Sequence, residues 1–151
     1  MDKHPQSNPS SVGNCIDFRD LCIGNLVTDE FYDSFKTIIR VESLDQRGIN
    51  LDIEDDGNWA ECAQTWIEPY YRFNILRPIP ISENLLLKLG AVKLESKDFP
   101  SFNLKGLQIN YINDVWIEYV SRAEIKGLHH LQNILYFRNM EDLDVSVLIK
   151  K

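Results

Sequence analysis

One central segment, Arg77–Gly90 (RPIPISENLLLKLG), constrains the fold of this chain more than any other feature. Pro78 and Pro80 fix their own φ angles and hold the residues before them in extended conformations. The side chain of Ser82 can accept a hydrogen bond from the first turn of a helix, and Gly90 suits the left-handed position that ends one. The segment therefore predicts an extended entry followed by a short helix.

Leucines give this short helix one apolar side. Leu85, Leu86 and Leu89 share a face by helical spacing, and Ile81 is placed to pack on Leu86 as a hydrophobic staple. About two turns are too few for an isolated helix to be stable in water, so the leucines must dock on something larger. A core helix is favoured, and a ridge that presents leucines to a partner is the alternative. The residues predicted to be structural are Ile81, Ser82, Leu85, Leu86, Leu89 and Gly90.

Length and composition indicate an ordinary globular chain. Its 151 residues make one domain the default, and 44% hydrophobic with 26% charged residues is typical of such domains. Residues 1–17 are rich in Ser, Asn and Pro and poor in apolar residues. We therefore predict a disordered tail over 1–17 and a single domain over 18–151.

The net charge of −7 limits the classes of molecule that the chain is expected to bind. It disfavours a broad contact with nucleic-acid phosphates and is compatible with a protein partner. Cys15, Cys22 and Cys62 show no disulfide or zinc spacing, so free thiols in a reducing cytoplasm are expected, with no cofactor. The sequence has no apolar run of about 20 residues and no secretory signal, so we expect no membrane association and a cytoplasmic location.

Several short strands are predicted around the central helix. Residues 36–44 and 49–54 alternate apolar and polar positions, and residues 59–71 return after a turn, which indicates a small antiparallel sheet or barrel. After the helix, residues 91–95 form a candidate strand. Residues 102–112 and 115–120 form a candidate hairpin with Asn113-Asp114 at its turn.

A longer helix is expected near the C-terminus. The sequence Ser121-Arg-Ala-Glu124 matches a capping box, and apolar residues at helical spacing continue to about Arg138, with Asn139 as the terminal left-handed residue. Alternation over 143–149 predicts a closing strand. Strands and helices do not alternate regularly, so the expected fold class is α+β: an N-terminal sheet or barrel, a short helix, a further hairpin and a longer C-terminal helix.

Two patterns resemble metal sites without completing one. Asp52, Glu54, Asp56 and Gly57 match the opening of a calcium loop, but its twelfth position is Ala63 instead of Glu, so we interpret the segment as a charged hairpin tip. His129-His130 are adjacent, and neighbours on a helix point about 100° apart, which rarely suits one ion. No metal site is predicted.

Catalytic residues are not assigned either. Cys62 with His129 or His130 and Asp114 would supply a thiol nucleophile site, but no local signature marks Cys62. The many aromatic residues lack interleaved basic residues, so core or interface packing is expected. Phe137 is an exception, because the helical wheel places it opposite the leucines, where an exposed aromatic indicates a contact surface.

Three segments together resemble a known group: Leu21–Val27 (LCIGNLV), Pro78–Gly90 (PIPISENLLLKLG) and Ile125–Phe137 (IKGLHHLQNILYF). They are similar, in order and spacing, to segments of small uncharacterised proteins encoded by phages, prophages and mobile elements of the Bacteroidetes. The resemblance covers most of residues 20–145. Ala91, where the group usually has an aromatic, and Arg138–Glu141 depart from its pattern.

The resemblance implies a bacterial or phage-infected cytoplasm and no known activity. His129, Gln132 and Asn133 match the polar part of the third segment, either as buried hydrogen-bonding groups or as a recognition patch. Together with Phe137 they are the candidate binding residues.

The sequence is compatible with two alternative functions. The first is a non-enzymatic protein of a mobile element that binds a host or phage protein. The second is a small enzyme or nucleotide-binding module that uses His129, Asn133 and Cys62. The sequence leaves the oligomeric state open, including a homodimer through the helix faces.

Overall fold

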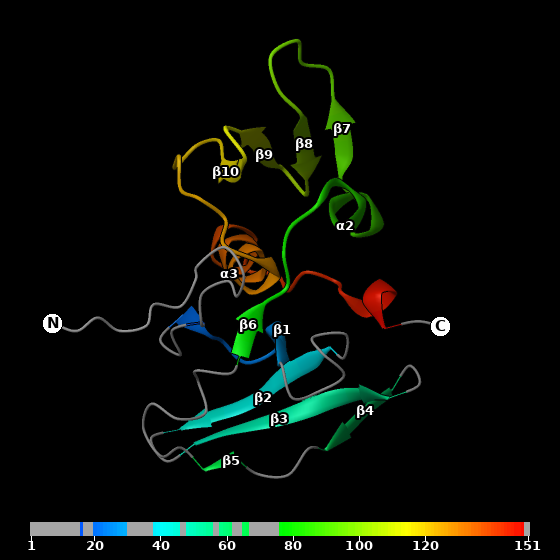
Figure 1. The fold of residues 1–151 in the computed structure, drawn as a ribbon, viewed down its shortest axis with the longest axis vertical. Coiled ribbons are helices and arrows are strands. Elements are labelled where there is room, and N and C mark those ends of the chain that lie inside the picture. The colour runs from blue at the N-terminus through cyan, green and yellow to red at the C-terminus, as the bar shows by residue number, and fades with distance from the viewer. Residues whose placement is uncertain are drawn as a thin grey trace, which may run out of the picture. The chain divides into compact units, whose positions relative to one another are not determined.

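The structure is a computed structural model that describes residue 16 and residues 20–29, 38–45, 48–55, 58–61, 65–66 and 76–149. These residues divide into two compact units (Figure 1). The first holds the described residues up to Ile79 apart from Asn58, and the second holds Asn58 and the residues from Pro80 onward. The fold class is α+β, as predicted, with antiparallel sheets and a C-terminal helix.

The first unit is built on a six-stranded sheet of order β4-β3-β2-β1-β6, with β5 paired to β3. The strand pairs β1–β2, β1–β6, β2–β3 and β3–β5 are antiparallel. The pairing of β2 with β3 shifts by one residue between Val41 and Ser43, which is a β-bulge. The strands are β1 (Leu26–Asp29), β2 (Ile39–Asp45), β3 (Gly48–Asp55), β4 (Asn58–Glu61), β5 (Thr65–Trp66) and β6 (Leu76–Pro78).

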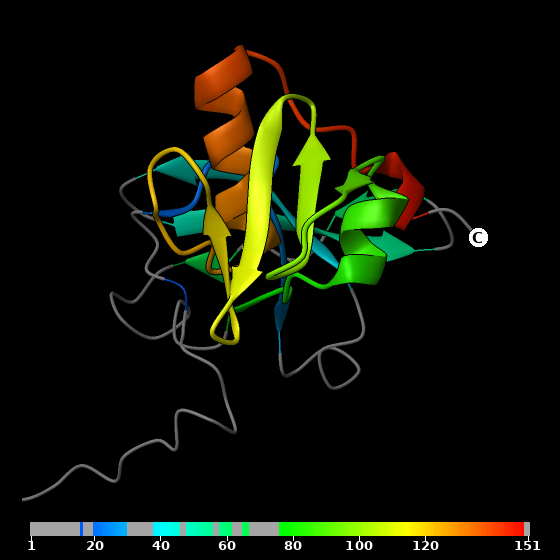
Figure 2. The same cartoon turned by 90° about the horizontal axis from the view of Figure 1, so that it is seen from above.

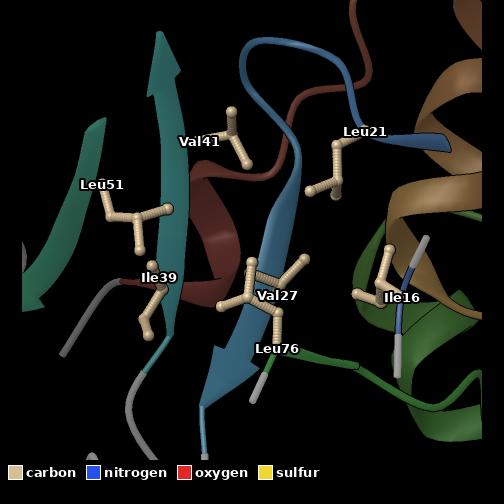
Figure 3. Packing of buried hydrophobic residues seen from close by; sticks show 7 residues of the cluster. All are labelled: Ile16, Leu21, Val27, Ile39, Val41, Leu51 and Leu76. Atoms are coloured by element: carbon tan, nitrogen blue, oxygen red, sulfur yellow. The ribbon is translucent and has the colours of Figure 1, made fainter. Parts of the chain in front are cut away.

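One face of this sheet carries the apolar core of the first unit. Val27 pairs with Ile39 across β1 and β2, and Val41 pairs with Leu51 across β2 and β3, so all four side chains point to the same side. Figure 3 shows the side chains of Val27 and Leu76 close together, with Ile39 beside them. The cluster consists of Ile16, Leu21, Val27, Ile39, Val41, Leu51 and Leu76.

Ile16 belongs to this core although it lies within the range predicted as a tail. It is 5% exposed, and its N–H donates to the carbonyl of Leu76 at 3.2 Å. The remainder of 1–17 lies outside the described residues, as do Gly57 at the predicted hairpin tip and Cys62. The boundaries of the tail and of one domain over 18–151 stay predictions.

The opposite face of the same sheet carries a charged pair. Arg40 and Asp52 pair across β2 and β3, with 2.6 Å between Nη2 and Oδ2, and the Asp52 side chain is only 11% exposed. The Arg40 guanidinium also lies 4.5 Å from the ring centroid of Trp59, a cation–π contact. Asp52, a candidate calcium ligand in the sequence, therefore serves a cross-strand ion pair.

In the second unit, α2 (Glu83–Lys88) follows the predicted boundaries closely. The hydroxyl of Ser82 accepts a hydrogen bond from the Leu85 N–H at 3.1 Å, which is the predicted N-cap. At the other end, the N–H of Gly90 donates to Leu87 and the N–H of Ala91 donates to Leu86. These two bonds form a Schellman motif, and Gly90 takes the left-handed φ of 98° that this motif requires.

Two of the three leucines expected on the buried face of this helix are buried, and Leu85 is less buried than predicted. Leu86 is fully buried and Leu89 is 7% exposed, whereas Leu85 is half-buried. Ile81 is buried at 9%, in keeping with a staple. Leu87 is 45% exposed on the other side of the helix. The burial of Leu86 and Leu89 favours the core interpretation of this helix.

A four-stranded antiparallel sheet of order β10-β9-β8-β7 forms the rest of the second unit together with α3. Two tight turns organise it, Lys105-Gly106 and Asn113-Asp114, and all four turn residues have positive φ. That geometry is the type I′ turn, whose twist matches neighbouring strands. The strands are β7 (Val92–Leu94), β8 (Ser101–Leu104), β9 (Leu107–Ile112) and β10 (Val115–Glu118).

Helix α3 (Leu128–Asn139) lies along one face of this sheet. Figure 2 shows α3 behind the sheet, and in Figure 1 it lies below it, so the two views agree. Leu128, Leu131 and Leu135 on α3 are at most 1% exposed. On β8 and β9, Phe102 and Ile109 are also buried and pair with each other.

Three details of the prediction are wrong. The expected strand over 102–112 is two strands, because Lys105-Gly106 reverses the chain. The long helix begins at Leu128 instead of near Ser121, and its left-handed terminal residue is Met140, φ 57°, instead of Asn139. The expected closing strand over 143–149 contains a short 3-10 helix, η4 (Ser146–Leu148).

Candidate functional site

The polar candidates on α3 are mostly inside the protein. His129 is 4% exposed and Gln132 is 9% exposed, while Asn133 is half-buried. The sequence left two interpretations open for these residues, and burial favours internal polar groups over a recognition patch. Phe137 is 73% exposed and is therefore separate from the buried His129 and Gln132, whereas Asn133, four residues before it, lies on the same side of the helix.

His130 has a local role at the start of α3. Its Nδ1 accepts a hydrogen bond from the backbone N–H of Lys126 at 3.1 Å. The N-cap position is occupied by Gly127, which offers no side chain. A side chain in the first turn that reaches back to the preceding backbone acts like the second half of a capping box. The bond gives the half-buried His130 a structural role at the start of α3.

The C-terminal end of α3 carries the exposed apolar residues of this helix. Phe137 is 73%, Met140 is 71% and Tyr136 is 42% exposed. The rings of Tyr136 and Phe137 lie edge to face, with centroids 6.1 Å apart. We call Tyr136, Phe137 and Met140 the α3 terminal patch. Phe137 was expected to be exposed from its position on the helical wheel, and this is confirmed.

Two polar contacts hold the helix end that bears the patch. Arg138 Nη2 donates to Oε1 of Glu118 on β10 at 3.1 Å. Asn139 Nδ2 donates to the carbonyl of Lys105, in the turn between β8 and β9, at 3.2 Å. The two contacts come from consecutive residues and reach β10 and the turn between β8 and β9. They tie the last turn of α3 to the sheet.

Glu118 is the buried centre of this anchoring. Its side chain is 1% exposed and also accepts hydrogen bonds from the backbone N–H groups of Val120 and Ser121. Burial alone would raise the pKa of the Glu118 carboxyl, but the hydrogen bonds and the charge of Arg138 outweigh it and lower this pKa below 4.5. Glu118 is therefore ionised at neutral pH.

Other exposed residues directly follow Glu118 and directly follow Met140 in the sequence. Tyr119 and Val120, directly after Glu118, are 50% and 67% exposed. Exposed acidic residues follow Met140 at Glu141 and Asp142. Sequence reasoning selected Phe137 and missed Tyr136 and Met140. The only sequence signal for Met140 is its spacing, three residues after Phe137 and four after Tyr136, which would place it near them on a continued helix. In the structure the helix ends at Asn139, and Met140 is left-handed with a φ of 57°.

Metal and thiol chemistry find no support among the described residues. No three His, Cys, Asp or Glu side chains of the described part are grouped as metal ligands. The exposed Cys22 is a free thiol, and partial burial raises its pKa, so less of it is the reactive thiolate at neutral pH. Within the described part of the chain, no helix is long and apolar enough to span a membrane.

Comparison of the chain with protein-family models, with curated proteins and with solved structures gave no match.

Proposed function

We propose that this chain is a non-enzymatic binding protein whose α3 terminal patch contacts a protein partner. The observation that carries this proposal is the 73% exposure of Phe137 on a helix end that Arg138 and Asn139 hold in place. An exposed phenylalanine on a mobile tail would be weak evidence for a binding surface. On an anchored helix end the same side chain is a pre-organised contact.

The chemistry of the patch suits a protein surface. Aromatic residues and methionine are enriched at the buried centres of protein interfaces, where they supply apolar area. Met140 is unbranched and flexible, which allows it to adapt to the shape of a partner. Two aromatic rings in edge-to-face contact, followed by the exposed thioether of Met140, therefore supply apolar surface at this helix end.

The partner is expected to be a cytoplasmic protein with a basic face. The chain has a net charge of −7, and the acidic residues Glu141 and Asp142 follow the patch directly. A cationic side chain of the partner could contact the ring of Phe137 and an acidic neighbour together. With the sequence resemblance, this leads us to propose a phage or mobile-element protein that binds a host or phage protein.

Site-specific photo-crosslinking tests the proposal. A photoreactive phenylalanine analogue at the position of Phe137 should give a discrete adduct in bacterial lysate. Excess unlabelled wild-type protein should abolish the adduct, whereas excess Phe137→Ser protein should not. Ile23 is a matched control position, because it is 66% exposed in the first unit and belongs to no proposed contact.

Two results would count against binding through the patch. One is an identical adduct pattern from the positions of Ile23 and Phe137. The other is equal competition by wild-type and Phe137→Ser proteins, which would place the contact elsewhere on the chain. The alternative of a small enzyme or nucleotide-binding module has no observation in its favour among the described residues, so we do not propose it.

A further inference from the structure

The two edges of the four-stranded sheet are treated differently by the chain. β10 and β7 are its outer strands. An unprotected sheet edge presents N–H and C=O groups that can pair with another strand, so proteins usually cover or blunt their edges. The turn geometry identifies which backbone groups point outward at each edge.

The alternation of hydrogen bonds follows from the two-residue turns. At the Lys105-Gly106 turn, Leu104 and Leu107 are the closing pair, and such a pair exchanges hydrogen bonds. The backbone groups of Phe102 therefore also face β9, and those of Ser101 and Asn103 face β7. Val92 and Leu94, which pair with Asn103 and Ser101, bond to β8.

Lys93 lies between Val92 and Leu94 and is opposite Phe102 in a pair that does not exchange hydrogen bonds. Its N–H and C=O consequently point away from the sheet. Neither group has a hydrogen-bond partner within the part of the chain that the structure describes. The outer edge of β7 thus offers one free donor and one free acceptor at Lys93.

On β10, the opposite outer strand, backbone groups that this alternation directs outward do form hydrogen bonds outside the sheet. The alternation assigns outward-pointing backbone groups to Trp116 and Glu118. The Trp116 carbonyl accepts from the Ile125 N–H at 2.8 Å, and the Glu118 N–H donates to the Ala123 carbonyl at 2.9 Å. The Glu118 carbonyl accepts from the Arg122 N–H at 2.8 Å. The chain covers the edge of β10 with its own residues, whereas no residue in the described ranges bonds to the outer backbone groups of β7.

The side chains next to the outer edge of β7 are largely exposed and add apolar and charged surface to it. Val92 is 63% exposed. The Lys93 Nζ lies 3.1 Å from Oε1 of Glu83 in an exposed ion pair, which contributes little to stability. A hollow lined by Lys93, Leu94, Glu95, Ser96 and Lys97 continues from the end of the strand.

We propose that the outer edge of β7 binds an extended segment of another protein, which joins the sheet as a fifth strand. The segment carries an acidic residue opposite Lys93 and aliphatic residues opposite Val92 and Leu94. Main-chain hydrogen bonds at Lys93 provide attachment, and the alternating side chains provide selectivity. The site is separate from the α3 terminal patch and does not depend on it.

Charge argues against a second copy of this chain as the occupant. Within β7, only Lys93 offers outward backbone groups, so a two-fold antiparallel dimer would form its hydrogen-bonded pair between Lys93 and its own copy. Like charges directly opposite each other destabilise a strand pair. A glutamate or aspartate in that position would instead bring an opposite charge to Lys93, in exchange for its exposed pair with Glu83. The adjoining hollow carries one further lysine, Lys97, and one carboxylate, Glu95.

The probe is the acetylated and amidated peptide Thr-Val-Glu-Val-Thr, titrated to millimolar concentration into the full-length isotope-labelled protein. Amide signals of Val92–Glu95 should shift in NMR spectra, and hydrogen exchange of the Lys93 N–H should slow. A peptide with lysine in place of glutamate should bind more weakly. No shift in this segment with either peptide would overturn the proposal.

Variants at Lys93 separate the main-chain and side-chain contributions. Lys93→Pro removes the outward N–H and no bond to β8, so the sheet should persist while peptide affinity falls about three- to tenfold. Lys93→Ala keeps the N–H and is the matched control. Lys93→Glu should reverse the peptide preference.

Three results would contradict the proposal in different ways. Equal affinity of wild-type and Lys93→Pro proteins would show that the peptide does not pair with β7. Binding by Lys93→Thr but not by wild type would identify Lys93 as a guard against edge pairing. A dimer in sedimentation that Lys93→Pro dissociates would make a second copy the occupant.

Discussion

Glu118 on β10 and Arg138 on α3 are joined by an ion pair of 3.1 Å across 20 residues of sequence. The Glu118 side chain is 1% exposed and the Arg138 side chain is 40% exposed. The pair therefore connects the interior of the second unit to its surface at the base of the α3 terminal patch. Stability and the geometry of the patch should both depend on it.

The pair predicts an acid-sensitive component of stability. The pKa of Glu118 is lowered in the folded protein, so the unfolded chain binds its proton first as the pH falls below 4.5. The contribution of Glu118 to the free energy of unfolding should be fully present above that pH. It should decline as the pH falls through the pKa of Glu118 in the folded protein. Urea unfolding monitored by circular dichroism between pH 3 and pH 6, roughly the range over which glutamates titrate, measures this dependence.

Glu118→Gln provides the comparison for this prediction. Glutamine keeps the size of the side chain but has no charge and one acceptor fewer, so we expect a loss of about 1–3 kcal/mol at neutral pH. Its stability should vary less with pH than that of the wild type over the same range. Identical pH profiles for the two proteins would mean that Glu118 does not contribute this component.

Two adjacent leucines of α2 allow a matched test of the core. Leu86 is fully buried, whereas Leu87 is 45% exposed on the same helix. Leu86→Ala should cost about 2–5 kcal/mol of unfolding free energy, because it removes buried methyl groups and leaves a cavity. Leu87→Ala should cost less than about 1 kcal/mol. Similar small losses for both would indicate that the leucines form a partner-binding ridge instead.

Helix α2 could be predicted from sequence because its signals are local. Ser82 caps the first turn with its own hydroxyl, and Gly90 takes a left-handed conformation that other residues adopt only at a cost. Both act within a few residues of where they stand. The turn at Asn113-Asp114 was predicted for the same reason, since both residue types tolerate positive φ.

Helix α3 begins later than its local sequence indicates, because tertiary contacts use the same residues. The Ser121 hydroxyl accepts from the Ala123 N–H instead of capping a helix, and Arg122 has a φ of 64°. Backbone groups of Arg122, Ala123 and Ile125 bond to the edge of β10. A capping-box pattern cannot reveal that a neighbouring strand needs these donors and acceptors.

The candidate site was predictable only in part. Helical spacing placed Phe137 away from the leucines, and its exposure follows from that geometry alone. The burial of His129 and Gln132 depends on what packs against α3, which periodicity does not specify. The position of Lys93 on an outer strand depends on the order of strands in the sheet, which appears only in the fold.

Phe137 should matter little for stability. Its side chain is 73% exposed, so Phe137→Ser should change the unfolding free energy by less than about 1 kcal/mol. Leu135→Ala, two residues earlier at a 1% exposed position, should cost about 2–5 kcal/mol. Thermal unfolding of the two variants measures the contrast. A large loss for Phe137→Ser would mean that the ring is packed in the fold and unsuited to binding.

Lys105 should be a site where a substitution stabilises the protein. It has a φ of 51° as the first central residue of the turn between β8 and β9, and lysine is strained in that conformation. Asparagine tolerates it, and Asn-Gly is the preferred pair for type I′ turns. Lys105→Asn should therefore raise the unfolding free energy by about 0.5–1 kcal/mol.

The control for this change is Lys97→Asn. Lys97 is exposed, like Lys105, but is not among the residues with positive φ, so the same substitution should leave the unfolding free energy unchanged within about 0.5 kcal/mol. Both replacements remove one positive charge, and a difference between them in chemical denaturation isolates the turn. An equal effect of the two variants would assign the change to charge, and a loss at Lys105 would mean that its side chain supports the hairpin.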